Sequence, residues 1–180
     1  MAEIQSERPR AREPDKNVSM IALVVAAADN GVIGDRSKIP WRIADDMKHF
    51  KALTLGKPCI MGRKTWESLP KKPLPDRTNI VVTRDRAFSA PGAIVAHTWD
   101  EALAQATRES SDEISVIGGA EIYAAALWQA SRIYLTEVHG AFDGDAHFRF
   151  DRADWRESAR DERATPEGLR YSFVRLERVR

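Results

Sequence analysis

The chain has 180 residues, of which 43% are hydrophobic and 31% are charged, a balance that suits one soluble domain with a sizeable core. Its 28 Lys and Arg residues against 27 Asp and Glu residues leave a net charge of +1, which argues against broad attraction to nucleic acid or anionic membrane. A single cysteine, Cys59, excludes an internal disulfide and a cysteine-rich zinc site.

The first 18 residues mix acidic and basic side chains with almost no large apolar ones, so we expect a disordered arm there and a folded domain over residues 19–180. The apolar run Met20–Ala28 is far shorter than the roughly 20 residues that span a bilayer. The residues before it do not form a signal peptide. We therefore expect a soluble, cytoplasmic protein.

Short apolar runs that alternate with helical stretches predict an α/β fold, a single domain with a central, mostly parallel sheet and about four flanking helices. The predicted strands are Met20–Ala28, Pro58–Met61, Asn79–Thr83, Ala93–Ala96, Ile114–Ile117 and Ile133–Val138. The predicted helices are Ala44–Leu55, Lys64–Leu69, Trp99–Glu109 and Ala120–Gln129. Two further strands, Trp155–Arg160 and Arg170–Val179, are expected to close the sheet edge as an antiparallel hairpin.

One acidic residue of the first predicted helix faces the wrong way for a solvated charge. At about 100° per residue, Asp46 lies on the apolar face with Phe50, whereas Asp45 lies about 145° away, towards solvent. A buried acid is costly without a partner. Either Asp46 pairs with Arg42 or helps to cap the helix start, or it faces a ligand with a cationic or amidine-like ring edge.

Two strand-to-helix turns have anion-binding character. Gly62-Arg63-Lys64-Thr65 combines a helix start with basic side chains, and Gly118-Gly119 permits close approach of the backbone to a pyrophosphate. Each turn alone is also compatible with ordinary packing.

The order and spacing of these motifs along the chain are specific. The segments are Asn30-Gly31-Val32-Ile33-Gly34, Ile39-Pro40-Trp41-Arg42, Asp46, Ile60-Met61-Gly62-Arg63-Lys64-Thr65-Trp66-Glu67-Ser68-Leu69, Pro73-Leu74-Pro75-Asp76-Arg77-Thr78-Asn79, Val116-Ile117-Gly118-Gly119-Ala120 and Tyr134-Leu135-Thr136. From about Ser19 to Arg178, the chain resembles dihydrofolate reductases of the bacterial, chromosomal type.

The resemblance implies NADPH-dependent reduction of 7,8-dihydrofolate to tetrahydrofolate, with hydride added to C6 and a proton to N5. It also implies binding of antifolate-type inhibitors and a monomer, with neither nucleic acid nor membrane as a partner. Asp46 would orient the pteridine while an ordered water delivers the proton. The implied catalytic group is completed by Thr136, which would hydrogen-bond Asp46, by Tyr123 beside the nicotinamide edge, and by Trp41.

The resemblance also assigns the two binding regions. The implied substrate-binding residues are Val24, Val25, Met47, Phe50, Leu53, Leu69 and Arg77, the last pairing with the glutamate α-carboxylate. The implied cofactor-binding residues are Ala26, Ile33, Gly34, Ile39, Gly62, Arg63, Lys64, Thr65, Thr83, Arg84, Gly118, Gly119, Ala120, Glu121 and Tyr123. Residues 30–40 would form a mobile loop that closes over the nicotinamide.

Two other functions stay open at this point, a riboflavin-pathway pyrimidine reductase and a non-catalytic relative that binds NADPH or folate.

His49 stands where the family often has an aromatic residue, and Ile39 stands where Met or Leu is frequent. The four histidines have no metal-ligand spacing, so we expect no metal and interpret all four as surface or structural residues.

Overall fold

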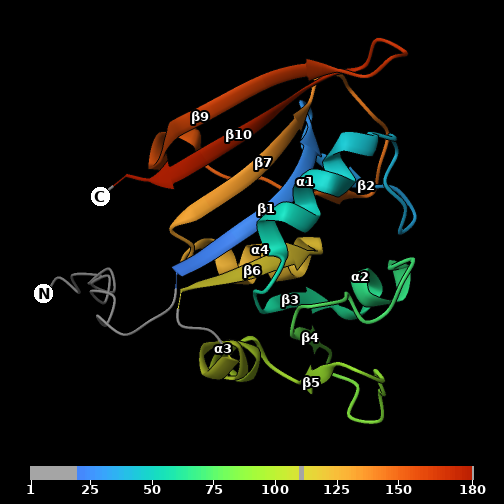
Figure 1. Ribbon diagram of the computed structural model, residues 1–180, viewed down its shortest axis with the longest axis vertical. Coiled ribbons are helices and arrows are strands. Elements are labelled where there is room, and N and C mark those ends of the chain that lie inside the picture. Colours follow the sequence, from blue (N-terminus) through green and yellow to red (C-terminus); the bar gives the residue numbers. More distant parts are fainter. Residues whose placement is uncertain (1–19, 110–111, 180) are drawn as a thin grey trace, which may run out of the picture.

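The computed structural model describes residues 20–109 and 112–179, so the predicted disordered arm lies outside the described residues. Within them the main feature is an eight-stranded sheet with the strand order β5-β4-β3-β6-β1-β7-β10-β9 (Figure 1). Its strands are β1 Met20–Ala28, β3 Cys59–Gly62, β4 Asn79–Val82, β5 Ile94–Ala96, β6 Glu113–Gly118, β7 Arg132–Val138, β9 Trp155–Ala164 and β10 Arg170–Arg178. A separate small sheet pairs β2 (Val32–Gly34) with β8 (Ala146–His147).

The predicted sheet architecture is confirmed. Strands β5, β4, β3, β6, β1 and β7 run parallel, and β10 pairs antiparallel with β7 and with β9. The central strands β3, β6 and β1 are largely buried because helices cover both of their faces. The antiparallel hairpin β9–β10 therefore closes one edge of the sheet, as expected.

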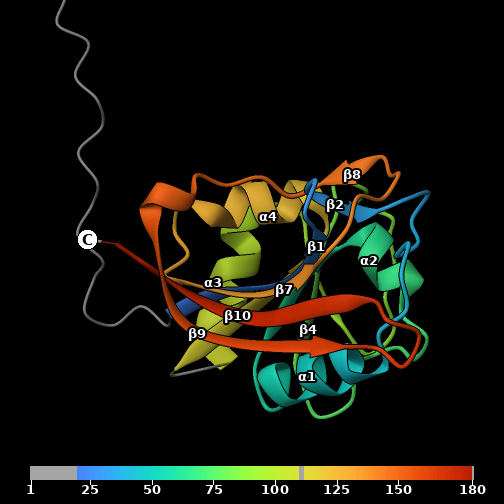
Figure 2. The ribbon, with the colours of Figure 1, turned by 90° about the horizontal axis from the view of Figure 1, so that it is seen from above.

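Four α-helices are present in the described part of the chain, and they divide between the two faces of the sheet. They are α1 Ala44–Thr54, α2 Arg63–Ser68, α3 Trp99–Glu109 and α4 Ala120–Leu127. Alternation along β3 shows the division, because Met61 packs with Trp66 of α2, whereas Ile60 packs with Ala102 and Ala106 of α3. Figure 2 shows α1 on the face opposite α3 and α4.

The predicted element boundaries were close in the core and wrong at the periphery. The α3 bounds agree with the prediction, and most other ends differ by one or two residues. Strand β9 continues to Ala164, four residues beyond the predicted end, because its outer half is exposed on both faces and carries no apolar alternation. The short strands β2 and β8 and the 3-10 turn η1 (Arg152–Asp154) were not predicted.

Candidate active site

Asp46 is held at the sheet by a residue distant in sequence. The Thr136 hydroxyl on β7 donates a 2.7 Å hydrogen bond to Asp46 Oδ1, and Thr136 itself is only 4% exposed. Burial raises the pKa of Asp46, although the Thr136 hydrogen bond and the nearby His49 act in the opposite direction. The carboxyl group is therefore kept in a setting that disfavours its charge.

Asp46 lies in the first turn of α1, but among the described residues it makes neither a side-chain cap bond nor an ion pair with Arg42. Helix α1 begins after Ile43, and no side chain caps its first turn. Arg42 is exposed, and no ion pair joins it to Asp46 in the described part of the chain. The ligand-facing interpretation is favoured because, among the described residues, the carboxylate has a neutral hydroxyl and no cation as its hydrogen-bond partner. Asp45 faces solvent as predicted, with its side chain 47% exposed, and it also accepts hydrogen bonds from Arg163 and from the Tyr171 hydroxyl.

Tyr123 joins α4 to β1 beneath the paired-glycine turn. Its hydroxyl donates a 2.7 Å hydrogen bond to the backbone oxygen of Val24, and complete burial raises the pKa of Tyr123. The phenol therefore stays protonated at any ordinary pH. Val24 and Val25 point to opposite faces of β1, because Val24 packs with α1 and α2 residues and Val25 packs with Tyr123. Val24 and Ala26 therefore lie on the face of β1 that is turned toward α1 and Asp46, and Val25 lies on the opposite face.

Most of the apolar residues predicted to bind substrate pack together, and we call this set the apolar wall. Phe50, Leu53 and Leu69 are half-buried against the same cluster as Val24. Met47 differs, since it is 60% exposed, and Trp41 meets the Phe142 ring edge-on with ring centres 5.2 Å apart. Met47 therefore adds little to the packed part of this wall, whereas Trp41 packs against the cluster that contains Ile43 and Phe173.

Arg77 is fixed at the end of this wall by groups that sequence reasoning missed. Its Nε donates to the backbone oxygen of Pro75 at 2.8 Å, and its Nη1 donates to Thr54 Oγ1 at 3.1 Å. Thr54 in turn donates to the Phe50 backbone oxygen within α1. A threonine four residues after an apolar helical residue signals such back-bonding. Asn79, which holds the backbone of Leu74 through two hydrogen bonds, gave no comparable signal.

The Gly118-Gly119 turn leaves little room for a side chain at Gly118. Its peptide bond is cis, and Gly118 has φ = +128°. A Cβ atom built on Gly118 would come within 3.2 Å of Thr65 Oγ1 and 3.4 Å of the Tyr123 hydroxyl oxygen. Helix α4 starts directly afterwards at Ala120, and no side chain caps its first amides. The turn therefore fits the close approach of a nucleotide cofactor.

The basic turn at the start of α2 is already engaged with acidic residues. Arg63 bonds Glu67 at 2.6 Å and Asp85 at 3.0 Å, and its guanidinium lies 4.5 Å from the centre of the Phe88 ring. Lys64 and Arg84 are exposed beside it, Thr65 and Thr83 are half-buried, and the Thr83 hydroxyl accepts from the Asp85 amide. The acidic partners of Arg63 were not predicted, although the i,i+4 spacing of Glu67 indicated one of them.

The remaining predicted cofactor residues lie on the segment from residue 30 to residue 40 and on α4. Ile33 packs against the core and Gly34 lies in β2, whereas Ile39 is 60% exposed. The backbones of Asp35 and Lys38 bond each other in a tight turn between them. Glu121 is exposed in the first turn of α4.

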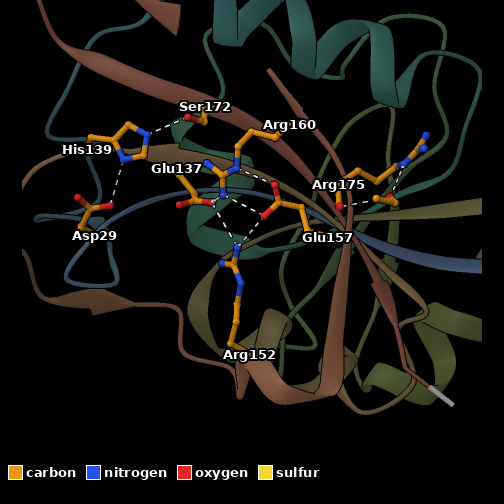
Figure 3. Close-up of polar contacts among 9 residues, drawn as sticks. Asp29, Glu137, His139, Arg152, Glu157, Arg160, Ser172 and Arg175 are labelled. Carbon is orange, nitrogen blue, oxygen red and sulfur yellow. Dashed lines mark hydrogen bonds and ion pairs between the residues drawn. The ribbon is translucent and has the colours of Figure 1, made fainter. Parts of the chain in front are cut away.

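One cluster of potential metal ligands lies on the other face of the sheet. Ligand atoms of Asp29, Glu137 and His139 come within 4.8 Å of one another. Arg152 and Arg160 both bond Glu137, and His139 contacts Ser172 (Figure 3). The arginines already neutralise this carboxylate, so we interpret the cluster as a polar network that ties β7 to the hairpin.

The α/β fold, the largely buried carboxylate of α1 and the paired-glycine turn before α4 are together typical of a class of protein, the nicotinamide-nucleotide oxidoreductases. The comparison with protein families narrows this class, because the sequence profile described as dihydrofolate reductase matches residues 20–178. The chain belongs to the dihydrofolate reductase family, as its motifs indicated.

Individual relatives support the same assignment. The chain is 47% identical to dihydrofolate reductase of Neisseria meningitidis serogroup B, over 86% of this chain and 95% of the relative. It is 42% identical to dihydrofolate reductase type 3 of Salmonella typhimurium, over 89% and 99%. A solved dihydrofolate reductase from Enterococcus faecalis, complexed with NADP(H) and RAB-propyl, superposes with a TM-score of 0.82 at 30% identity, covering 89% of this chain and 97% of that one.

The activity of this family is the reduction of dihydrofolate to tetrahydrofolate, with NADPH as the cofactor, and the protein is an oxidoreductase of this kind. The names of these relatives favour it over the riboflavin-pathway alternative. Among the helices of the described ranges, none has the length and apolar content to cross a membrane.

Proposed function

We propose that Asp46 is the group that binds and orients the pteridine ring of dihydrofolate. The observation that carries this proposal is the Asp46–Thr136 pair, a largely buried carboxylate whose hydrogen-bond partner is a neutral hydroxyl. Thr136 occupies one position on Oδ1, so the carboxylate can still accept two parallel hydrogen bonds. The 2-amino group and N3 of the pteridine present two donors with that spacing, and a bidentate, charge-assisted contact fixes ring orientation.

The charge of Asp46 also suits the chemistry at the neighbouring ring atoms. Reduction of C6 is favoured when N5 carries a proton, because the resulting cation draws electrons from C6. A carboxylate in a site of low polarity stabilises that cation, and it does so before the reaction begins. Asp46 would act in this way without itself delivering the proton, for which an ordered water is the donor we expect.

Residues around the Gly118-Gly119 turn and the start of α2 fit the cofactor. When bound, NADPH supplies the hydride that C6 receives. Gly118 and Gly119 would let its diphosphate and nicotinamide approach the backbone, with Thr65 facing the same turn. Arg63, Lys64, Thr83 and Arg84 would hold the phosphates, including the 2′-phosphate of the adenosine.

The other end of the substrate would lie along the apolar wall. Phe50, Leu53 and Leu69 offer apolar surface to the aminobenzoyl ring, beside exposed Met47. The glutamate α-carboxylate would then reach Arg77, whose recorded hydrogen bonds use Nε and a single Nη1 contact. The rest of its planar fork can receive a carboxylate.

The test is turnover of NADPH and dihydrofolate, followed by loss of NADPH absorbance, with D46N measured in parallel. We expect D46N to lower kcat/KM by about two to three orders of magnitude, as expected when a preorganised electrostatic contact is removed. D45N is the matched control on the same helix and should retain activity. A folded wild-type protein that binds NADPH without turning over dihydrofolate would refute the assignment and favour a binding-only relative or the riboflavin-pathway substrate.

We also propose that the protein acts as a monomer in the cytoplasm and binds antifolate-type inhibitors at the same site. Large exposed apolar side chains such as Ile39, Leu55 and Trp128 are spread over separate elements. Burial raises the pKa of Cys59 to about 12, so this thiol stays protonated and unreactive. Light scattering that gave twice the mass of 20.2 kDa would contradict the monomer.

A further inference from the structure

His49 lies one helical turn after Asp46 and is stacked against the sheet. Its ring is parallel to that of Phe173 on β10, with the ring centres 3.9 Å apart and an angle of 21° between the planes. Phe173 is the cross-strand partner of Thr136, the residue that donates to Asp46. Cross-strand partners have Cβ atoms about 5 Å apart, so His49 stacks directly beside the Asp46–Thr136 pair.

Asp46, His49, Phe173 and Thr136 form a cycle of contacts between α1 and the strands β7 and β10. Asp46 and His49 occupy the same face of α1, Thr136 and Phe173 are neighbours on β7 and β10, and each helical residue contacts one strand residue. No hydrogen-bond partner for the imidazole nitrogens is present in the described ranges. The half-buried ring can therefore take up a proton from solvent without breaking a contact.

Other titratable groups lie around the stacked rings. Asp46 on α1 and Arg163 and Asp161 on β9 act on the charge of the imidazole, whereas Asp45 and Tyr171 bond each other beside Arg163. The Arg163 guanidinium lies 5.0 Å from the centre of the Phe173 ring, which stacks on His49. Arg163 is itself bonded to Asp161 and Asp45. Since Asp161 and Asp45 already bond this arginine, Asp46 is the acid on the face of His49 with no cation bonded to it.

We propose that His49 is a positioning residue for Asp46. The neutral His49 ring holds α1 on Phe173, and in acid the protonated His49 ring stabilises the ionised carboxylate of Asp46. The proposal rests on the pteridine-binding role given to Asp46 above. It extends that role, because the charge of the substrate-binding group would depend on a second residue that does not contact substrate.

The direction of the coupling follows from the two environments. Burial lowers the pKa of His49 and raises the pKa of Asp46, so their titration ranges approach each other. Protonated His49 favours ionised Asp46, and ionised Asp46 favours protonated His49. Because such coupling is reciprocal, removing either partner shifts the other by the same amount.

NMR titration of the ligand-free protein tests this directly, with the His49 ring and the Asp46 carboxyl carbon as the two probes. In D46N, the midpoint of the His49 titration should move to lower pH. In H49F, the midpoint of the Asp46 titration should move to higher pH by an equal amount. Midpoints that stay unchanged in both variants would refute the proposal. The titration needs no substrate, so its outcome is separate from whether dihydrofolate is turned over.

Kinetics distinguish charge from packing. H49F keeps the ring stack and removes the charge, whereas H49Q removes both. We expect kcat/KM for dihydrofolate, as a ratio to wild type, to fall about two- to fivefold in H49F at pH 5 and to be unchanged at pH 8. A purely structural role predicts a different result, in which H49F matches wild type at every pH and H49Q is equally impaired at both. K48Q removes a cation from the exposed face of α1, and its pH profile should match that of wild type.

Discussion

Replacing Asp46 with asparagine should make the ligand-free protein more stable at neutral pH. Burial raises the pKa of Asp46 above its ordinary value of 3.8, which means that the folded state disfavours the ionised carboxylate. Between that value and the higher pKa of the folded state, the folded protein binds more protons than the unfolded chain. Stability therefore falls as the pH rises through this window, and the whole penalty is present at pH 7.

The size of the effect can be worked from two opposing contributions. Changing the acceptor from a carboxylate to an amide weakens the 2.7 Å hydrogen bond from Thr136 by about 1 kcal/mol. Relief of desolvation gives several kcal/mol for a fully buried ion, and about 2 kcal/mol is reasonable for a partly buried one. The net gain is about 1 kcal/mol, which corresponds to a rise in Tm of about 3 °C for a chain of this size.

Thermal unfolding followed by circular dichroism at several pH values measures this difference. D46N should unfold at a higher temperature than wild type at pH 7, and the two curves should converge in acid, where Asp46 is protonated in both states. D45N is the control, because the Asp45 carboxyl is 47% exposed and bonds Arg163 and Tyr171. Removing the Asp45 charge should therefore not raise the unfolding temperature. A D46N protein that is less stable than wild type at pH 7, by the same margin at every pH, would refute the reasoning.

Three further changes test the remaining groups. T136V removes the donor to Asp46 and should lower kcat/KM about tenfold, whereas T136S should retain most activity. G118A places a methyl group 3.2 Å from Thr65 Oγ1 at φ = +128° and should weaken NADPH binding, measured by fluorescence titration, at least about tenfold. G119A is milder because the nearest atom lies at 3.7 Å. R77K keeps the charge but loses the planar fork, and should raise the KM for dihydrofolate about tenfold with a smaller change in kcat.

Each of these expectations has a result that contradicts it. Wild-type kinetics for T136V would show that the hydroxyl does not orient Asp46. Equal losses of NADPH affinity in G118A and G119A would show that the close contact at Gly118 is irrelevant. An unchanged KM in R77K would place the glutamate carboxylate elsewhere.

The central sheet could be predicted because its signal is local. Strand β1 is nine consecutive apolar residues, and their burial on both faces made the prediction correct at both ends. The edge strand β9 was predicted too short, since its only partner is β10 and its outer residues are exposed charges. Strands β2 and β8, of three and two residues, arise from pairing between segments more than a hundred residues apart.

In the candidate site, too, local features were predicted and contacts between distant segments were not. Helical geometry correctly placed Asp46 on the inner face of α1, but it could only suggest partners on that helix, such as Arg42. Its actual partner, Thr136, lies 90 residues away on β7. Asp45 was correctly assigned to the solvent side, but its partners Arg163 and Tyr171 were missed, because the hairpin that carries them belongs to the end of the chain.

Helix α1 must hold a destabilising carboxylate in place, and its other residues explain how this is possible. Asp45 bonds the hairpin, His49 stacks on Phe173, and Thr54 bonds Arg77. These contacts lie along the length of the helix and join it to two parts of the fold, the β9–β10 hairpin and the segment before β4. Because they do not involve Asp46, its charge can be poorly solvated without the helix moving away from the sheet. The hairpin at the edge of the sheet therefore contributes to the precision of the substrate site, although it supplies no residue that we expect to contact substrate.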